Sequence, residues 1–158
     1  MHQIRPWLYV ASYPEASSAK VVADAGATAM LQLFEPFDLD GVETLYLDTM
    51  DGYPLVNKNI RRGVDFVRQK HAAGKTVVIS CGAGISRSVT YTIAVLKELE
   101  GLSMEAAYRS VRDQHPDALP DQTHWESLNA YYDDENTPFW EIWKQVLIDE
   151  DDDTNDTD

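Results

Sequence analysis

The chain has 158 residues, of which 44% are hydrophobic, and its 27 acidic residues against 13 lysines and arginines give a formal net charge of −14. This length and apolar content fit one folded domain with a full core, and the negative charge disfavours nucleic acid and anionic lipid as partners. The single cysteine, Cys81, cannot form an internal disulfide, and no apolar run reaches the length of a membrane span. We therefore expect a cytoplasmic protein with no nucleic-acid or membrane partner.

The acidic residues are concentrated at the C-terminal end. Seven of them lie in residues 149–158, so the first 148 residues carry 20 acids and 13 bases, a net of −7. We expect residues 1–148 to form a single domain and residues 149–158 to form a solvated, disordered tail. The chain has only six lysines, and an acidic, lysine-poor composition also fits adaptation to molar intracellular salt.

Strands that alternate with helices are predicted in the first half of the chain, and helices alone in the second half. Short apolar runs bounded by polar or turn residues predict strands at 6–12, 27–34, 42–48 and 75–80. Apolar residues at helical spacing, with capping residues or closing glycines, predict helices at 14–26, 58–73, 86–101, 103–113, 121–134 and 138–148. We expect an α/β fold, with a central mixed sheet flanked by helices.

The segment ISCGAGISRSVT, residues 79–90, joins a predicted buried strand to a long helix through a glycine-rich loop. The backbone N–H groups of residues 82–87 can converge on one point there, and the helix N-terminus adds its positive end. Gly82 and Gly84 allow the curvature of the loop. Arg87 can bind two oxygens of a phosphate. The segment therefore predicts an anion site.

The same electrostatic field favours the thiolate form of Cys81, which would then be a nucleophile beneath a bound phosphate. Ser88 can donate a hydrogen bond to that sulfur. A cysteine considered alone is more often a buried, inert side chain. Gly82, Gly84, Arg87 and Ser88 around it make catalysis the better interpretation.

The pattern Cys-x5-Arg-Ser between a strand and a helix resembles the signature of the cysteine-dependent protein tyrosine phosphatases, and AGISRS resembles their dual-specificity branch. Three further segments resemble the same family, so that residues 3–132 are covered: IRPWLYVAS, VDFVRQKHAAGKTVVISC and VRDQHPDALPDQTHWESLNAYY. The resemblance implies a phosphatase that uses no metal or cofactor and forms a phosphocysteine intermediate on Cys81. It implies that Ser88 assists the leaving thiolate and that phosphate is bound by Gly82, Ala83, Gly84, Ile85, Ser86 and Arg87.

The family also uses an acid on a separate loop before the cysteine, and YLDTMDGYPL offers Asp48 and Asp51. Asp51 follows the predicted strand and opens the loop, so it is preferred as the acid that protonates the leaving oxygen. Asp48 is interpreted as the polar end of the strand. One residue departs from the family pattern: Ser80 stands where a histidine usually precedes the cysteine, which predicts weaker activation of the thiol with the architecture unchanged.

Protein phosphotyrosine, with or without phosphoserine and phosphothreonine, is the expected substrate. Relatives that act on phosphoinositides or RNA 5′-triphosphates tend to have basic residues inside the loop, and GAGIS has none. Two alternatives remain: a phosphopeptide-binding pseudophosphatase, and a phosphatase of small-molecule phosphates. His115 lies in a loop that the family places near the active site. The aromatic segment PFWEIWKQVLI, residues 138–148, is expected to dock on the domain or on a partner.

Overall fold

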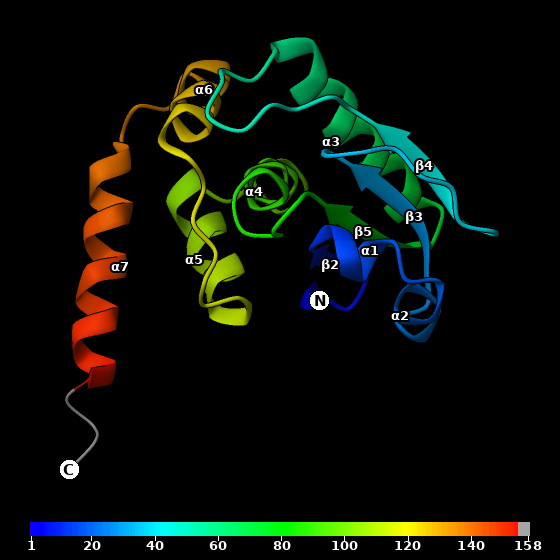
Figure 1. The fold of residues 1–158 in the computed structure, drawn as a ribbon. Helices are drawn as coiled ribbons and strands as arrows, with labels where there is room; N and C mark the ends of the chain where they lie inside the picture. Colours follow the sequence, from blue (N-terminus) through cyan, green and yellow to red (C-terminus); the bar gives the residue numbers. More distant parts are fainter. Residues whose placement is uncertain (155–158) are drawn as a thin grey trace.

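The computed structural model describes residues 1–154, and within them five strands form one mixed sheet in the order β1-β2-β5-β3-β4. The strands are β1 (His2–Arg5), β2 (Leu8–Ala11), β3 (Ala27–Gln32), β4 (Glu43–Tyr46) and β5 (Thr76–Ser80). β1 is antiparallel to β2, and the other neighbours are parallel. The α/β fold with a mixed central sheet is therefore confirmed (Figure 1).

Helices cover both faces of this sheet. They are α1 (Tyr13–Ala16), α2 (Ala19–Asp24), α3 (Asn57–Ala72), α4 (Arg87–Glu100), α5 (Met104–Gln114), α6 (Gln122–Tyr132) and α7 (Phe139–Thr154). One core cluster joins the sheet to α3, α4, α5 and α6, and a smaller cluster joins its other face to α1 and α2. The apolar run of central strand β5 is unbroken because both of its faces are buried. Val77 and Ile79 pack in the larger cluster, and Val78 packs in the smaller one on the opposite face.

Two predicted elements near the N-terminus are divided in the structure. The strand expected at 6–12 is the second half of a hairpin, since β1 pairs with β2 and only Ile4 of β1 is buried. The helix expected at 14–26 is two short helices, because Ser17 closes α1 and Ser18 begins α2 by accepting a hydrogen bond from the Val21 nitrogen.

The C-terminal helix is longer than expected. α7 continues to Thr154, so the expectation of a disordered tail is wrong for residues 149–154, while residues 155–158 lie outside the described part of the chain. Within the extension, the Asp149 carboxylate lies 3.6 Å from Nη2 of Arg112 on α5, an ion pair that connects α7 to the domain.

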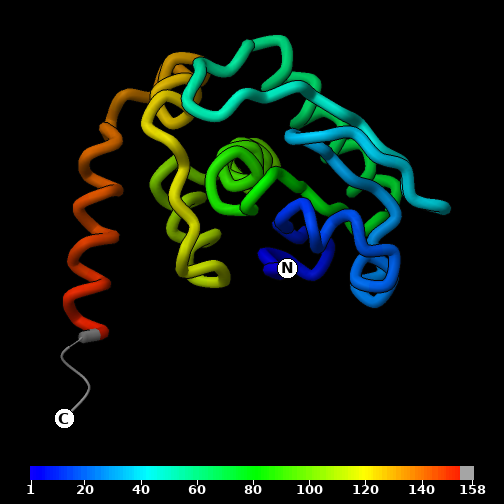
Figure 2. The backbone as a smooth tube through the Cα atoms, in the orientation of Figure 1, coloured from blue at the N-terminus to red at the C-terminus, as the bar shows by residue number. Residues whose placement is uncertain are grey.

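The apolar stripe of α7 is only partly covered. Ile142 is buried in the main core and Phe139 packs against it, whereas Trp140, Trp143, Leu147 and Ile148 are exposed. Figure 2 shows α7 running beside α5 at the edge of the molecule. For the exposed residues, docking on the domain or on a partner stays a prediction.

Candidate active site

The glycine-rich loop lies between the end of β5 and the start of α4, as the sequence predicts. Cys81 is 2% exposed. Its Sγ lies 3.2 Å from the backbone nitrogen of Gly84, which donates to it, and 3.2 Å from Oγ of the buried Ser88. Both groups can stabilise negative charge on the sulfur, and α4 begins directly behind them with its positive N-terminal end.

The N-terminal side of the loop packs tightly against the segment that follows β2. The Tyr13 nitrogen donates to the Gly82 carbonyl at 2.9 Å, and the Cys81 nitrogen donates to the Ala11 carbonyl at 3.3 Å. Gly84 has a φ of +72°, and a Cβ added to it would lie 2.8 Å from the Ser12 nitrogen. Glycine is therefore required there both by the left-handed backbone and by the close approach of another chain segment.

The other side of the loop is held by residues between α5 and α6. His115 is 3% exposed, and its Nε2 lies 2.7 Å from the Gly84 carbonyl. Since a carbonyl only accepts, Nε2 of His115 carries the proton. Ile85 and Ser86 are held by the same segment, since the Leu119 nitrogen donates to the Ile85 carbonyl and the Asp121 nitrogen donates to Ser86 Oγ. Ser86 therefore has a structural contact in addition to its backbone N–H.

Arg87 is the first residue of α4, and its guanidinium turns back over the loop. Nη1 donates to the Thr49 carbonyl at 3.0 Å and lies 3.5 Å from the Leu33 carbonyl. A Cβ added to Gly82 would lie 3.1 Å from Nη2, so the guanidinium sits directly beside the first residue of the loop. Arg87 is thereby held where it can bind the oxygens of a phosphate above Cys81.

The loop after β4 reaches Arg87 through Thr49 and is fixed to α6 at two points. His124 Nε2 lies 3.3 Å from the Met50 carbonyl, and the Leu55 nitrogen donates to Ser127 Oγ at 3.0 Å. Figure 2 shows this loop passing alongside α6 before α3 begins. The structure therefore brings the acid-bearing segment to the phosphate loop.

Both candidate acids are exposed on this segment. Asp48 accepts a hydrogen bond from the Tyr46 hydroxyl at 3.3 Å. Partial desolvation raises the pKa of Tyr46, and the charge of Asp48 raises it further. Asp51 lies in a turn in which the Tyr53 nitrogen donates a hydrogen bond to the Met50 carbonyl at 3.4 Å. Within residues 1–154 no hydrogen bond or ion pair engages its carboxylate.

Three contacts around the site have no signal in the sequence. Thr49 and Leu33 contribute backbone carbonyls, which any residue type has, and His124 contacts a loop that lies far from it in the chain. The resemblance placed His115 near the site, but its hydrogen bond to the Gly84 carbonyl is visible only in the structure. In the described part of the chain no group of three or more His, Cys, Asp or Glu is arranged to hold a metal ion. No helix of that part has the length and apolar character needed to cross a bilayer.

A parallel strand followed directly by a cysteine, a glycine loop and a helix that begins with arginine define a phosphate site of the cysteine-dependent protein tyrosine phosphatase type. The comparisons with known proteins agree with this class. The family model described as "Dual specificity phosphatase, catalytic domain" matches residues 8–134. The chain belongs to this family, and the resemblance stated from the sequence is confirmed.

Individual relatives are distant. The chain is 28% identical over 136 residues to dual specificity protein phosphatase 12 of Rattus norvegicus, which covers 82% of this chain and 40% of that protein. It is 24% identical over 140 residues to phosphatidylglycerophosphate phosphatase PTPMT1 of Arabidopsis thaliana, covering 82% of this chain and 42% of that protein. The chain thus spans well under half the length of these two relatives. Among solved structures, human DUSP28 matches with a TM-score of 0.77 at 23% identity, covering 83% of this chain and 94% of that one, which supports the fold.

Proposed function

We propose that the chain is a protein phosphatase that hydrolyses phosphotyrosine, with or without phosphoserine and phosphothreonine, through a phosphocysteine intermediate. The observation that carries the proposal is the surroundings of the Cys81 sulfur, which lies 3.2 Å from both the Gly84 nitrogen and Ser88 Oγ. Donors at this distance stabilise a sulfur anion, which is the form that attacks phosphorus.

In the first step the Cys81 sulfur attacks phosphorus, and the bond between phosphorus and the ester oxygen breaks. Arg87 and the N–H groups of residues 82–87 bind the three remaining oxygens and stabilise the charge that develops on them. Asp51 gives its proton to the leaving oxygen. In the second step Asp51 takes a proton from the water that attacks the phosphocysteine, and inorganic phosphate and the thiolate are released. Ser88 donates a hydrogen bond to the departing sulfur.

The intermediate can be tested directly by rapid acid quench during hydrolysis of an aryl phosphate. We expect a burst of one phenol per protein chain and a phosphate group on the peptide that contains Cys81, located by mass spectrometry. Cys81→Ser should abolish both signals. Steady turnover with no burst and no covalent phosphate, measured under conditions where breakdown is slow, would argue for direct attack by water.

Two substrates with different leaving groups distinguish the candidate acids Asp51 and Asp48. Asp51→Asn should slow hydrolysis of phenyl phosphate by about 10²–10⁴-fold. It should leave hydrolysis of an aryl phosphate with an acidic phenol much less affected, because such an oxygen leaves without a proton. Asp48→Asn is the matched control and should change both rates equally and slightly. The reverse pattern would assign the acid role to Asp48.

A phosphatase of small-molecule phosphates is the second candidate, favoured by the similarity to a relative whose name states phosphatidylglycerophosphate as its substrate. The loop between Cys81 and Arg87 has no lysine or histidine, and Glu35, Asp48 and Asp51 are exposed on the neighbouring loops. This acidic surrounding supports a protein substrate over a polyanionic lipid or nucleotide. Assays of phosphopeptides, phosphatidylglycerophosphate and nucleotides at equal concentration decide between the two.

A binding module without chemistry is the third alternative. It would be supported by a folded protein that binds a phosphopeptide but shows no turnover at any pH or salt concentration. The retained Cys81, Arg87 and acid loop favour an enzyme. We further propose that residues 1–148 act as one phosphatase domain in the cytoplasm, where a reducing environment keeps a catalytic thiol free.

A further inference from the structure

Large apolar side chains are exposed on the phosphate loop and on the two chain segments whose Leu33 and Thr49 carbonyls contact Arg87. They come from that loop, from the ends of β3 and β4, and from the segments that follow these strands: Phe34, Tyr46, Met50, Tyr53, Val56 and Ile85. Exposed apolar groups that gather beside a polar site are typical of a binding surface. Among them, the Phe34 ring lies beside Arg87 and Gly82, which are expected to bind phosphate.

The ring of Phe34 lies next to both Arg87 and the start of the loop. Its centroid is 5.4 Å from Cζ of Arg87. A Cβ added to Gly82 would lie 3.9 Å from two carbons of the ring. Phe34 as a residue is 39% exposed, so it remains accessible to a bound molecule. Phe34 therefore forms one wall of the place where Arg87 would bind phosphate.

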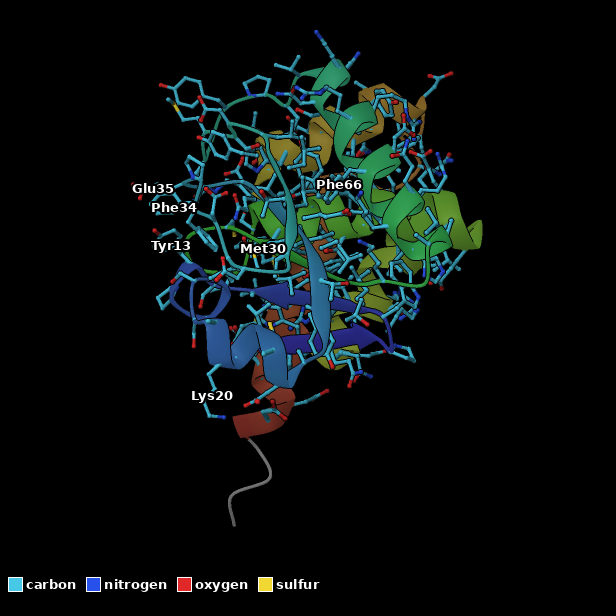
Figure 3. All side chains as sticks on the ribbon, turned by 90° about the vertical axis from the view of Figure 1, so that its right-hand side faces the viewer. Tyr13, Lys20, Met30, Phe34, Glu35 and Phe66 are labelled. Carbon is cyan, nitrogen blue, oxygen red and sulfur yellow. The ribbon has the colours of Figure 1, made fainter. Side chains whose placement is uncertain are left out.

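The position of this wall is fixed by its own surroundings. The buried Gln32 side chain donates from Nε2 to the Phe37 carbonyl at 2.8 Å and accepts from the Phe37 nitrogen at 3.4 Å, which closes the loop that carries Phe34. Tyr13 packs edge-on against both rings, with centroids 5.4 Å from Phe34 and 5.5 Å from Phe37. Figure 3 shows Tyr13, Phe34 and Glu35 together at one edge of the molecule.

We propose that Phe34 is a specificity-determining residue that contacts the aromatic ring of phosphotyrosine and thereby favours aryl over alkyl phosphomonoesters. This inference rests on the proposed function of the same site. In phosphotyrosine the ring is bonded directly to the ester oxygen, so a phosphate held by Arg87 brings that ring to the wall. Phosphothreonine has only an aliphatic carbon and a methyl group at the same place. Two aromatic rings whose centroids lie about 4.5–7 Å apart attract each other in edge-to-face or offset-stacked arrangements, in addition to the gain from burying their surface.

The test compares two peptides of identical sequence, one with phosphotyrosine and one with phosphothreonine, on the wild type and on Phe34→Ala. We expect kcat/KM for the phosphotyrosine peptide to fall by about three- to tenfold, with the phosphothreonine peptide changed by less than about twofold. Phe34→Leu keeps an apolar wall without a π face and should give an intermediate loss. Trp140→Ala removes another exposed aromatic, on α7 outside the matched domain, and should change neither rate.

An equal loss for both peptides would overturn the proposal, because Phe34 would then act only by positioning Arg87. Binding of both peptides to Cys81→Ser, with and without Phe34→Ala, separates this inference from the proposed function. If the wild type hydrolyses neither peptide, the proposed function fails, and the binding ratio still decides about Phe34. A selective loss of phosphotyrosine binding supports the wall, and an unchanged ratio overturns it.

Discussion

His115→Ala would break a contact that connects the segment after α5 to the centre of the phosphate loop. The peptide groups of Gly84 have two partners: the nitrogen donates to the Cys81 sulfur at 3.2 Å, and the carbonyl accepts from His115 Nε2 at 2.7 Å. Removing the imidazole therefore releases the residue that supplies a donor to the nucleophile. The His115 ring also stacks on His2, with centroids 3.7 Å apart, so its loss leaves a gap beside the loop.

The size of the effect follows from burial. His115 is 3% exposed, so the freed Gly84 carbonyl gains little access to water. An unsatisfied buried acceptor costs about 1–3 kcal/mol. We expect the free energy of unfolding to fall by about this amount. If half of the cost, about 0.5–1.5 kcal/mol, is expressed as misplacement of the loop, kcat/KM should fall by about two- to tenfold.

Denaturant unfolding and aryl phosphate hydrolysis measure the two effects separately. His115→Gln can donate from its amide to the same carbonyl and should restore part of the activity. His71→Ala is the control, because His71 stacks on Trp7 with centroids 3.7 Å apart and has no contact with the loop. A His115→Ala protein that is less stable but has unchanged kcat/KM would refute the link between His115 and the nucleophile.

Three further substitutions test the packing around the site. Gly84→Ala places a Cβ 2.8 Å from the Ser12 nitrogen at a φ of +72° and should abolish phosphate binding, measured with vanadate, whereas Gly101→Ala, also at positive φ but in open space, should only lower the melting temperature. Gln32→Leu removes both hydrogen bonds to Phe37 and should lower activity on a phosphotyrosine peptide more than on a phosphothreonine peptide, in parallel assays. Burial opposes ionisation of Glu98, but hydrogen bonds from Arg61, Tyr132 and Arg68 outweigh it and lower the pKa of Glu98 below 4.5. Ionised Glu98 therefore stabilises the folded protein above pH 4.5, and this contribution is lost as the pH falls through the lowered pKa. Glu98→Gln should lower the free energy of unfolding at pH 7 and much less in acid, as measured by denaturant unfolding.

The elements that the sequence predicted well are those whose own residues are buried in a continuous or periodic pattern along the chain. β5 and α4 are buried along most of their length, so their apolar residues are continuous or periodic. β1 gave no such signal, because only Ile4 of its four residues is buried and its place in the sheet depends on backbone pairing with β2. The extension of α7 through its acidic end was missed for a similar reason, since composition does not reveal the contact between Asp149 and Arg112.

The residues of the site likewise fall into those that sequence spacing predicts and those that only the structure reveals. Cys81, Gly84, Arg87 and Ser88 are neighbours in the sequence, so the chemistry of the loop could be proposed from their spacing. The groups that hold the loop come from distant segments: the Leu119 and Asp121 nitrogens donate from the backbone, and His115 donates from its side chain. Phe34 is also distant from the loop in the chain, and nothing in its local sequence distinguishes it from any aromatic residue at the end of a strand. Only the fold places its ring beside Arg87.

Ser80 shows how the two kinds of information combine. The sequence predicted weaker thiol activation because serine replaces the histidine that usually precedes the cysteine, and this stays a prediction. In the structure Ser80 is buried at the end of β5, and its carbonyl accepts from the Leu33 nitrogen at 2.9 Å. A different histidine nevertheless contacts the loop: His115, which lies 31 residues after Gly84, donates a hydrogen bond to the Gly84 carbonyl. The support of the loop therefore does not depend on the residue before the cysteine alone, and any loss of activation caused by Ser80 has to be measured in the presence of His115.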